Sequence, residues 1–107
     1  MFASIRRYRL ESGSMDDLLH LIDTDFAESI SQADGFVAYE VLECGADELV
    51  TMSVFRDSDA AEASDEMAME WIRSAVSPHY EITRTDVIHG EVVVSRAMSE
   101  MLEPAHH

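Results

Sequence analysis

The residues with the clearest potential for chemistry stand near the amino end, at Ser4, Arg6 and Tyr8. If residues 2–9 form a strand, these side chains share one face, because successive strand residues point to opposite sides. An arginine facing a pocket can hold an enolate or phenolate oxygen and stabilise the charge that forms when a substrate loses a proton. The alternative is that Arg6 reaches solvent or pairs with a carboxylate. We take Arg6 as a candidate catalytic residue, and Ser4 and Tyr8 as candidate substrate contacts.

Proton removal near neutral pH points to histidine, the side chain that titrates there. His79 follows Pro78 in an expected connector, with Tyr80 beside it, and His89 precedes Gly90 in the last expected strand. We take His79 and His89 as candidate bases and Tyr80 as a candidate substrate contact at the pocket mouth. The alternative for both histidines is a structural or solvated position, with His89 marking a bulge.

The only tryptophan, Trp71, shares an apolar stripe with Met67 on the second expected helix. Its ring can stack on a flat substrate, although a tryptophan at helical spacing also suits a plain core position. We take both residues as candidate substrate contacts for a small apolar or aromatic ligand. The alanines of this helix either let it lie close to the sheet or leave a cavity, and both outcomes stay open: Ala60, Ala63, Ala68 and Ala75.

Neither metal nor phosphate chemistry has a matching pattern. The residues Cys44, His20, His79 and His89 lack the spacing of a metal-ligand set. The four glycines form no phosphate-binding loop, and the acidic pairs of the helices fit a solvated face. We therefore expect no metal and no cofactor.

The charge argues against several classes of partner. Twenty-two acidic residues stand against seven arginines, with no lysine, for a net charge of −15. Such a surface repels phosphate groups, so we expect neither nucleic acid nor an anionic membrane as a partner. Concentrated salt screens the self-repulsion, which leads to the hypothesis of a salt-loving source organism. Equal stability in dilute buffer and in molar salt would contradict it and favour an ordinary acidic protein.

Length and cysteine content set the class of protein. A chain of 107 residues with 47% hydrophobic residues suits one domain with a real core. No apolar run approaches the length of a membrane span, and the first residues lack the apolar stretch of a signal peptide. One cysteine cannot form an internal disulfide. We expect a cytoplasmic protein with a single domain over residues 2–96 and a tail over 97–107.

Periodicity predicts the first half of the chain. A strand over 2–9 is followed by a helix that Ser14 caps, with Asp17 completing a capping box. Two strands over 35–43 and 48–56 then form a hairpin through the intervening turn. The first helix carries an apolar stripe at Met15, Leu18, Leu19, Ile22, Phe26 and Ile30.

In the second half, we expect a helix that Ser58 caps and that ends before Pro78, because proline cannot continue the hydrogen-bond ladder. Its stripe should include Ala60, Ala63, Met67, Trp71 and Ala75. A connector over 79–84 should lead to a last strand from about 86 to 96, centred on the run of valines Val92–Val94. The tail shows weak helical character.

The order strand, helix, strand, strand, helix, strand predicts an α+β, ferredoxin-like βαββαβ fold. In that fold a four-stranded antiparallel sheet carries both helices on one face. Both faces of the hairpin are apolar. Alternation puts Phe36, Ala38 and Leu42 opposite Val37, Tyr39 and Val41, and it puts Leu49 and Phe55 opposite Val50, Met52 and Val54.

The face without helices would therefore expose several apolar side chains, such as Val37, Val41, Val50, Met52 and Val54. Leaving them in water would forfeit several kcal/mol at ~25 cal/mol per Å2. We therefore expect a two-fold homodimer that packs sheet face to sheet face. The alternative is a monomer with a tolerated apolar patch.

At this point the chain resembles a known family, the small antibiotic biosynthesis monooxygenase-like proteins. The resemblance rests on the opening strand, the helix ending in Ile30, the segment Asp34-Gly35-Phe36-Val37-Ala38-Tyr39 and the segment Ser53-Val54-Phe55-Arg56-Asp57. It covers roughly residues 2–96. It implies a dimeric α+β barrel with a pocket between sheet and helices.

The resemblance implies that some members oxidise phenols or quinols with dioxygen and without metal or flavin, whereas others degrade haem through a first-strand asparagine with a tryptophan and a histidine. This chain has no asparagine, and Arg6 falls near its expected place. Haem degradation is therefore not expected. We expect a cofactor-independent monooxygenase in which Arg6 orients the oxyanion, Trp71 stacks and a histidine assists proton removal. The alternatives are a non-catalytic ligand-binding or stress-related module, and an isomerase-type proton transfer.

Overall fold

A four-stranded antiparallel sheet forms one layer of the molecule. The computed structural model is described here for residues 1–97, so the predicted tail helix and His106–His107 lie outside the described residues. The strands are β1 (Phe2–Ser12), β2 (Phe36–Glu43), β3 (Glu48–Phe55) and β4 (Glu81–Glu91). They lie in the order β2-β3-β1-β4, and all neighbouring strands are antiparallel.

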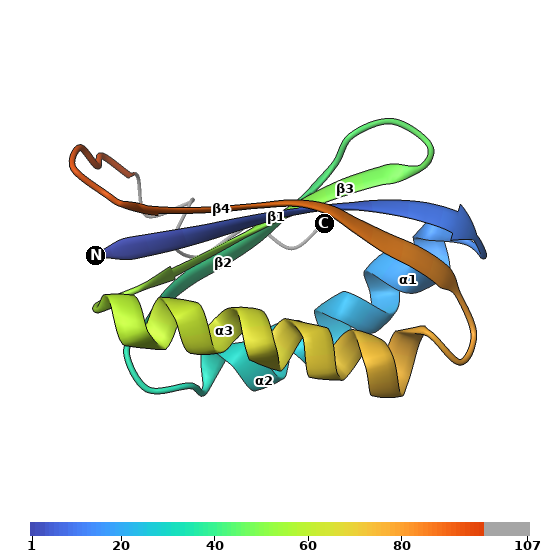
Figure 1. Ribbon diagram of the computed structural model, residues 1–107, viewed down its shortest axis with the longest axis horizontal. Helices are drawn as coiled ribbons and strands as arrows, with labels where there is room; N and C mark the ends of the chain where they lie inside the picture. Colours follow the sequence, from blue (N-terminus) through green and yellow to red (C-terminus); the bar gives the residue numbers. More distant parts are fainter. Residues whose placement is uncertain (98–107) are drawn as a thin grey trace.

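The helices form the second layer, and they all cover the same face of the sheet (Figure 1). The first helical segment runs through α1 (Met15–Leu21), the π-helical turn η1 (Ile22–Phe26) and α2 (Ala27–Ser31). The second runs through α3 (Ser58–Trp71) and the π-helical turn η2 (Ile72–Val76). The predicted ferredoxin-like fold is thus confirmed. None of the helices in the described part of the chain is long and apolar enough to cross a membrane.

The first helical segment matches its predicted start and stripe. The Ser14 hydroxyl accepts a hydrogen bond from the Asp17 amide at 3.3 Å. The buried residues advance in steps of four from Leu18 through Ile22 and Phe26 to Ile30. In a regular helix of 3.6 residues per turn, such steps drift around the axis. The wider π-helical turn absorbs this drift, so the stripe stays on the sheet. The same holds for Ala68, Ile72 and Val76 across η2.

The second helical segment corrects two predictions. Its cap is Asp57, whose side chain accepts a hydrogen bond from the Ala60 amide at 2.8 Å, and Ser58 is already the first helical residue. The fully buried stripe of α3 lies to one side of the predicted one. It consists of Ala61, Ser64 and Ala68, whereas Ala63 is exposed and Met67 and Trp71 are half-buried. This rotation brings Ser64 and Asp65 toward a buried arginine of the sheet.

The last strand also begins earlier than predicted. Residues 81–84, expected to form a connector, already belong to β4, which ends at Glu91. The Val92 amide still donates to the Met1 carbonyl at 2.8 Å, but Val93 and Val94 are 81% and 82% exposed. The prediction that the strand is centred on the valines was wrong, because valine favours strands mainly where its side chain packs on a half-buried sheet. Here pairing with β1, and not the valines, fixes the strand.

The sheet faces follow the predicted alternation on β1 and β3 and depart from it on β2. A bulge between Phe36 and Ala38 shifts the alternation, so Phe36 packs into the core with Tyr39, and Val41 faces the helices as well. On the open face, the pairing aligns Met52, Ile5 and Ile88 in one row across three strands. Ile88 and Leu42 are 54% and 51% exposed. The predicted apolar character of the open face is therefore present, with Val41 removed from it.

Candidate functional site

A fully buried arginine lies at the centre of the helix-covered face. Arg6 on β1 has no exposed surface. Its Nε donates to Thr51 at 3.2 Å, its Nη1 to Ser64 at 3.3 Å and to Asp65 at 2.8 Å, and its Nη2 to Ser53. Of the five N–H groups of a guanidinium, these contacts occupy four. The predicted alternative of an ion pair with a carboxylate is therefore realised within the protein.

Asp65 is the carboxylate that joins the polar residues around Arg6. Its Oδ1 accepts hydrogen bonds from Ser4 at 2.5 Å and from Arg6 at 2.8 Å, and its Oδ2 contacts His89 Nε2. Burial by itself raises the pKa of a carboxyl group. Here the hydrogen bonds from Ser4, His89 and Arg6, together with the Arg6 charge, hold the pKa of Asp65 below its usual range. Asp65 therefore stays ionised and neutralises Arg6.

A small cavity, the core cavity, separates the sheet from the helices beside this network. Its volume is about 20 Å3. Its walls are mainly apolar side chains from both helical segments and from the inner face of the sheet. The full lining of the core cavity is Arg6, Tyr8, Leu18, Ile22, Phe26, Tyr39, Leu49, Thr51, Ala68, Trp71, Ile72, Val76 and Ile82. Both π-helical turns contribute, as is common for such turns at functional sites.

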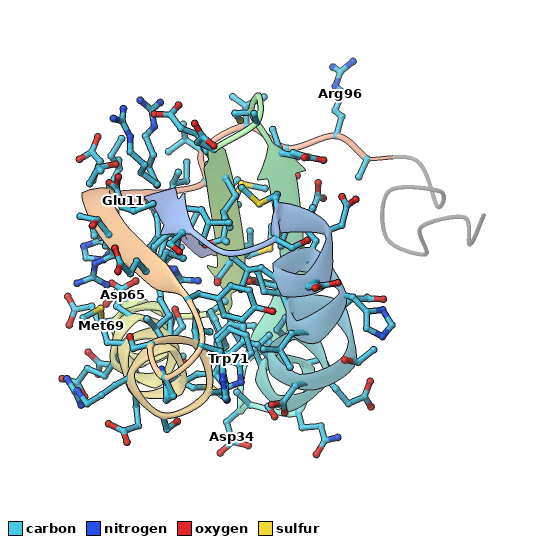
Figure 2. All side chains as sticks on the ribbon, turned by 90° about the vertical axis from the view of Figure 1, so that its right-hand side faces the viewer. Glu11, Asp34, Asp65, Met69, Trp71 and Arg96 are labelled. Atoms are coloured by element: carbon cyan, nitrogen blue, oxygen red, sulfur yellow. The ribbon has the colours of Figure 1, made fainter. Side chains whose placement is uncertain are left out.

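A larger hollow, the α3–β4 groove, adjoins the core cavity. It consists of two spaces of about 490 and 210 Å3 that share Met69, Arg73 and Arg84. The smaller space also shares Tyr8, Ile72 and Ile82 with the core cavity. In Figure 2, Asp65 and Met69 lie on the side of α3 toward β4, and Trp71 lies between α3 and the first helical segment. The full lining is Tyr8, Asp65, Glu66, Met69, Glu70, Ile72, Arg73, Ser77, Ile82 and Arg84.

Arg84 is the unusual residue of the α3–β4 groove. Its Nη1 is buried and makes no hydrogen bond within the described part of the chain, the one such side-chain atom there. Two further ion pairs line the groove, in which Asp65 pairs with Arg6, and Arg73 pairs with Glu70 at 2.6 Å. A buried donor without a partner costs free energy. This N–H group can donate a hydrogen bond to a ligand oxygen in the groove.

Two tyrosines, the buried Tyr8 and the half-buried Tyr39, border the core cavity. Burial raises the pKa of the Tyr8 hydroxyl, and the charges of Arg6 and Arg84 only partly offset this effect. Burial also raises the pKa of Tyr39 far above its usual value. Both hydroxyls are therefore protonated at neutral pH and serve as hydrogen-bond donors rather than bases.

Trp71 closes the cavity on the helix side. Its ring centroid lies 5.3 Å from that of Phe26, and its Nε1 donates to Asp25 at 3.0 Å. Asp25 belongs to η1 and Trp71 ends α3, so this hydrogen bond ties the two helical segments together. Its contacts with Phe26 and Asp25 fix the Trp71 ring as a flat wall of the cavity.

The structure brings some of the predicted site residues together and keeps others apart. Arg6, Tyr8 and Trp71 line the core cavity. Ser4 and His89 lie beside it, both bound to Asp65. Three predicted contacts, Met67, His79 and Tyr80, line neither the cavity nor the groove. Met67 packs against the buried cluster that includes Phe26 and Phe55, and His79 is exposed. Tyr80 lies against Gly13, which has a φ of 114°.

The family comparison decides the affiliation of the chain. The sequence model described as Antibiotic biosynthesis monooxygenase matches residues 1–68. The chain belongs to this family. Nothing among the curated proteins matches it.

Solved structures agree with this family in fold. SnoaB from Streptomyces nogalater, a cofactor-independent oxygenase, has a TM-score of 0.60 at 16% identity, covering 91% of this chain and 95% of its own. HapK from Hahella chejuensis has a TM-score of 0.65 at 14% identity, covering 92% and 98%. A dimeric ferredoxin-like protein from an uncultured marine organism has a TM-score of 0.57 at 12% identity, covering 92% and 100%. At these identities the likeness concerns the fold.

In this family member, two functional candidates were not found from the sequence. Asp65 is one of twenty-two acidic residues and sits in a helix rich in them. Arg84 was assigned to the connector before the last strand, where a side chain has no defined face. The signal that could have found Arg84 is the alternation of β4, in which Ile82 and Arg84 share the face that pairs with Tyr8 and Leu10.

Proposed function

We propose that this protein is a cofactor-independent monooxygenase that oxidises a small phenol- or quinol-like aromatic compound with dioxygen. The observation that carries the proposal is the buried, unpartnered Nη1 of Arg84, beside the protonated Tyr8, where the α3–β4 groove meets an apolar cavity. A cationic donor and a neutral donor in an apolar setting suit an anionic ring oxygen. Membership in the family and the fold shared with SnoaB support the reaction class.

In the proposed reaction, the ring lies in the α3–β4 groove with its oxygen on Arg84. The hydroxyl proton passes to His89, which Asp65 holds at the edge of the groove. Electrons then pass from the phenolate to dioxygen. The reduced dioxygen bonds to a ring carbon as a hydroperoxide. That carbon then loses its hydrogen as a proton and the O–O bond breaks, so that one oxygen atom becomes a ring carbonyl. The other leaves as water with the protons from the hydroxyl and the ring carbon, and the substrate supplies all four electrons.

This assignment moves the oxyanion contact from Arg6 to Arg84. The Arg6 guanidinium is already neutralised by Asp65 and has four hydrogen bonds. We assign to Arg6 the positioning of Asp65, and through it of His89. A second hollow, of about 410 Å3 on the other side of the core cavity, suits an anion less well. Its lining includes Asp23 and Glu43 and no basic residue.

The small size of the core cavity is also compatible with a non-catalytic ligand-binding module. A core cavity of about 20 Å3 holds no ring system, so a bound aromatic compound has to lie in the groove outside the core. A non-catalytic ligand-binding module would show the same groove. The two functions differ in whether bound ligand consumes dioxygen.

Oxygen uptake tests the proposal. Purified protein is mixed in air with naphthol-, anthrone- and quinol-type compounds, and isothermal titration calorimetry under nitrogen measures binding. We expect at least one compound both to bind and to be oxidised with uptake of dioxygen. Binding without uptake would favour the ligand-binding module. Neither binding nor uptake across the panel would contradict both functions.

We further propose that the protein is a homodimer that packs through the open sheet face. The row formed by Met52, Ile5 and Ile88 crosses the centre of this face, and no helix of the described chain covers it (Figure 1). Burying such side chains contributes about 1.5–3 kcal/mol each. A second copy offers the same row by symmetry.

A single charge should separate the two subunits. Met52→Glu places a carboxylate at the centre of the apolar row, and we expect sedimentation at micromolar concentration to change from a dimer to a monomer. Ala63→Glu, on the exposed face of α3, adds the same charge far from the row and should leave the dimer intact. A monomeric wild-type protein, or a Met52→Glu variant that sediments as a dimer, would contradict this interface.

A further inference from the structure

The core cavity has the size and chemistry of a site for one small apolar molecule. Its volume of about 20 Å3 exceeds the roughly 10–15 Å3 needed to hold one water molecule, and it is too small for an aromatic ring. The walls are mostly aliphatic and aromatic, and Leu18, Phe26, Leu49 and Val76 among them are buried.

Water is a poor occupant for such a cavity, because a buried water requires about two to four hydrogen-bond partners. Among the polar wall groups, Arg6 Nε donates to Thr51 Oγ1 at 3.2 Å, and Trp71 Nε1 donates to Asp25 at 3.0 Å. Dioxygen needs no hydrogen bond, and apolar cavities of proteins take up gases such as xenon.

We propose that the core cavity is the dioxygen site and that the aromatic substrate binds beside it in the α3–β4 groove. This inference rests on the proposed function, because it assigns a place to the second substrate of that reaction. The two spaces share the side chains of Tyr8, Ile72 and Ile82. Only these side chains would then separate dioxygen from the aromatic ring that reduces it.

Xenon tests the gas site without any turnover. Crystals or solutions of the wild-type protein are exposed to xenon, and occupancy is read by anomalous scattering or by xenon NMR. We expect one xenon atom in the core cavity. An ordered water there, or no xenon at pressures that fill apolar cavities in other proteins, would overturn the inference.

A variant that fills the cavity tests the link to the reaction. Ala68→Val adds bulk at a wall of the cavity, and we expect it to exclude xenon and to raise the KM for dioxygen by about tenfold. The affinity for the aromatic compound, measured by isothermal titration calorimetry under nitrogen, should stay the same. Ala61→Val is the matched control, because Ala61 is equally buried on α3 but does not line the cavity. An unchanged KM for dioxygen in Ala68→Val would overturn the inference.

A second variant covers the case in which Ala68→Val does not fold. Leu18→Ala enlarges the same cavity, and we expect more xenon uptake with no rise in the KM for dioxygen. Loss of xenon uptake in this variant would count against the site. Failure of the proposed function is distinct from failure of this inference. In the first case no compound is oxidised although xenon binds, and in the second a compound is oxidised although xenon stays out.

Discussion

Replacement of Asp65 by asparagine is expected to lower the free energy of unfolding by about 3–5 kcal/mol at neutral pH, the usual cost of removing one partner from a buried ion pair. The Asp65 side chain is 14% exposed, and that of Arg6 is fully buried. Asparagine has nearly the same shape but no charge, so the Arg6 guanidinium would remain buried without compensation. Urea unfolding of wild type and variant measures the difference.

The effect of this substitution should depend on pH. The pKa of Asp65 is lower in the folded protein than in the unfolded chain, so the unfolded state binds more protons and stability rises with pH. The contribution of Asp65 is therefore fully present above the ordinary carboxyl pKa of about 4 and is lost as the pH falls below it. We expect the difference between wild type and Asp65→Asn to shrink in that acid range.

Glu62→Gln provides the control for the acidic background. Glu62 is exposed on the same helix, so its loss removes the same charge without a buried partner. We expect a change of stability within about 0.5 kcal/mol. If Asp65→Asn were no more destabilising than Glu62→Gln, the Arg6–Asp65 pair would not be what stabilises this part of the core.

The sequence predicted the fold because the two periodicities of the chain are clear. The stripe from Met15 to Ile30 and the alternation of Ser4, Arg6 and Tyr8 both match the structure. The boundaries of β4 were wrong, because the valines at 92–94 have a strong strand propensity but no neighbouring strand to pair with beyond Val92. Pairing is a long-range property, and a local pattern does not contain it.

The candidate site was predicted in part for a similar reason. Alternation along one strand was enough to place Arg6 and Tyr8 on the inner face, and helical spacing along one helix was enough to place Trp71 there. The partner of Arg6 depends on how α3 rotates over the sheet, which the alanine-rich stripe left open. A helix with small residues on neighbouring stripes can settle on either, and here the buried guanidinium selects the stripe that offers Ser64 and Asp65.

Under the proposed function, Arg6 contributes to stability and Arg84 to substrate binding. Arg6 has partners for nearly all its donors and supports the core. Arg84 keeps a buried donor without a partner, which costs stability. Unfavourable local features of this kind are expected mainly at functional sites, which supports the proposed role of Arg84.

Replacement of Arg84 by glutamine is therefore expected to lower kcat for the aromatic substrate by about 10²–10³, the typical loss when one donor to a developing oxyanion is removed. Stability should move the other way. Removing the unpartnered Nη1 removes a desolvation cost of roughly 1–3 kcal/mol, so the Tm of Arg84→Gln should equal or exceed that of the wild type. Steady-state oxygen uptake and thermal unfolding measure the two effects on the same preparation.

Two further variants separate charge from geometry in this experiment. Arg84→Lys keeps the charge but not the planar fork of donors, so we expect it to restore only part of the rate. Arg9→Gln removes a charge from an exposed arginine that pairs with Glu48, and it should leave kcat unchanged. A parallel fall of Tm and kcat in Arg84→Gln would mean that Arg84 supports the fold and does not bind the substrate oxygen. The orphaned donor would then be an ordinary imperfection of packing, and the oxyanion contact would have to come from Tyr8 alone.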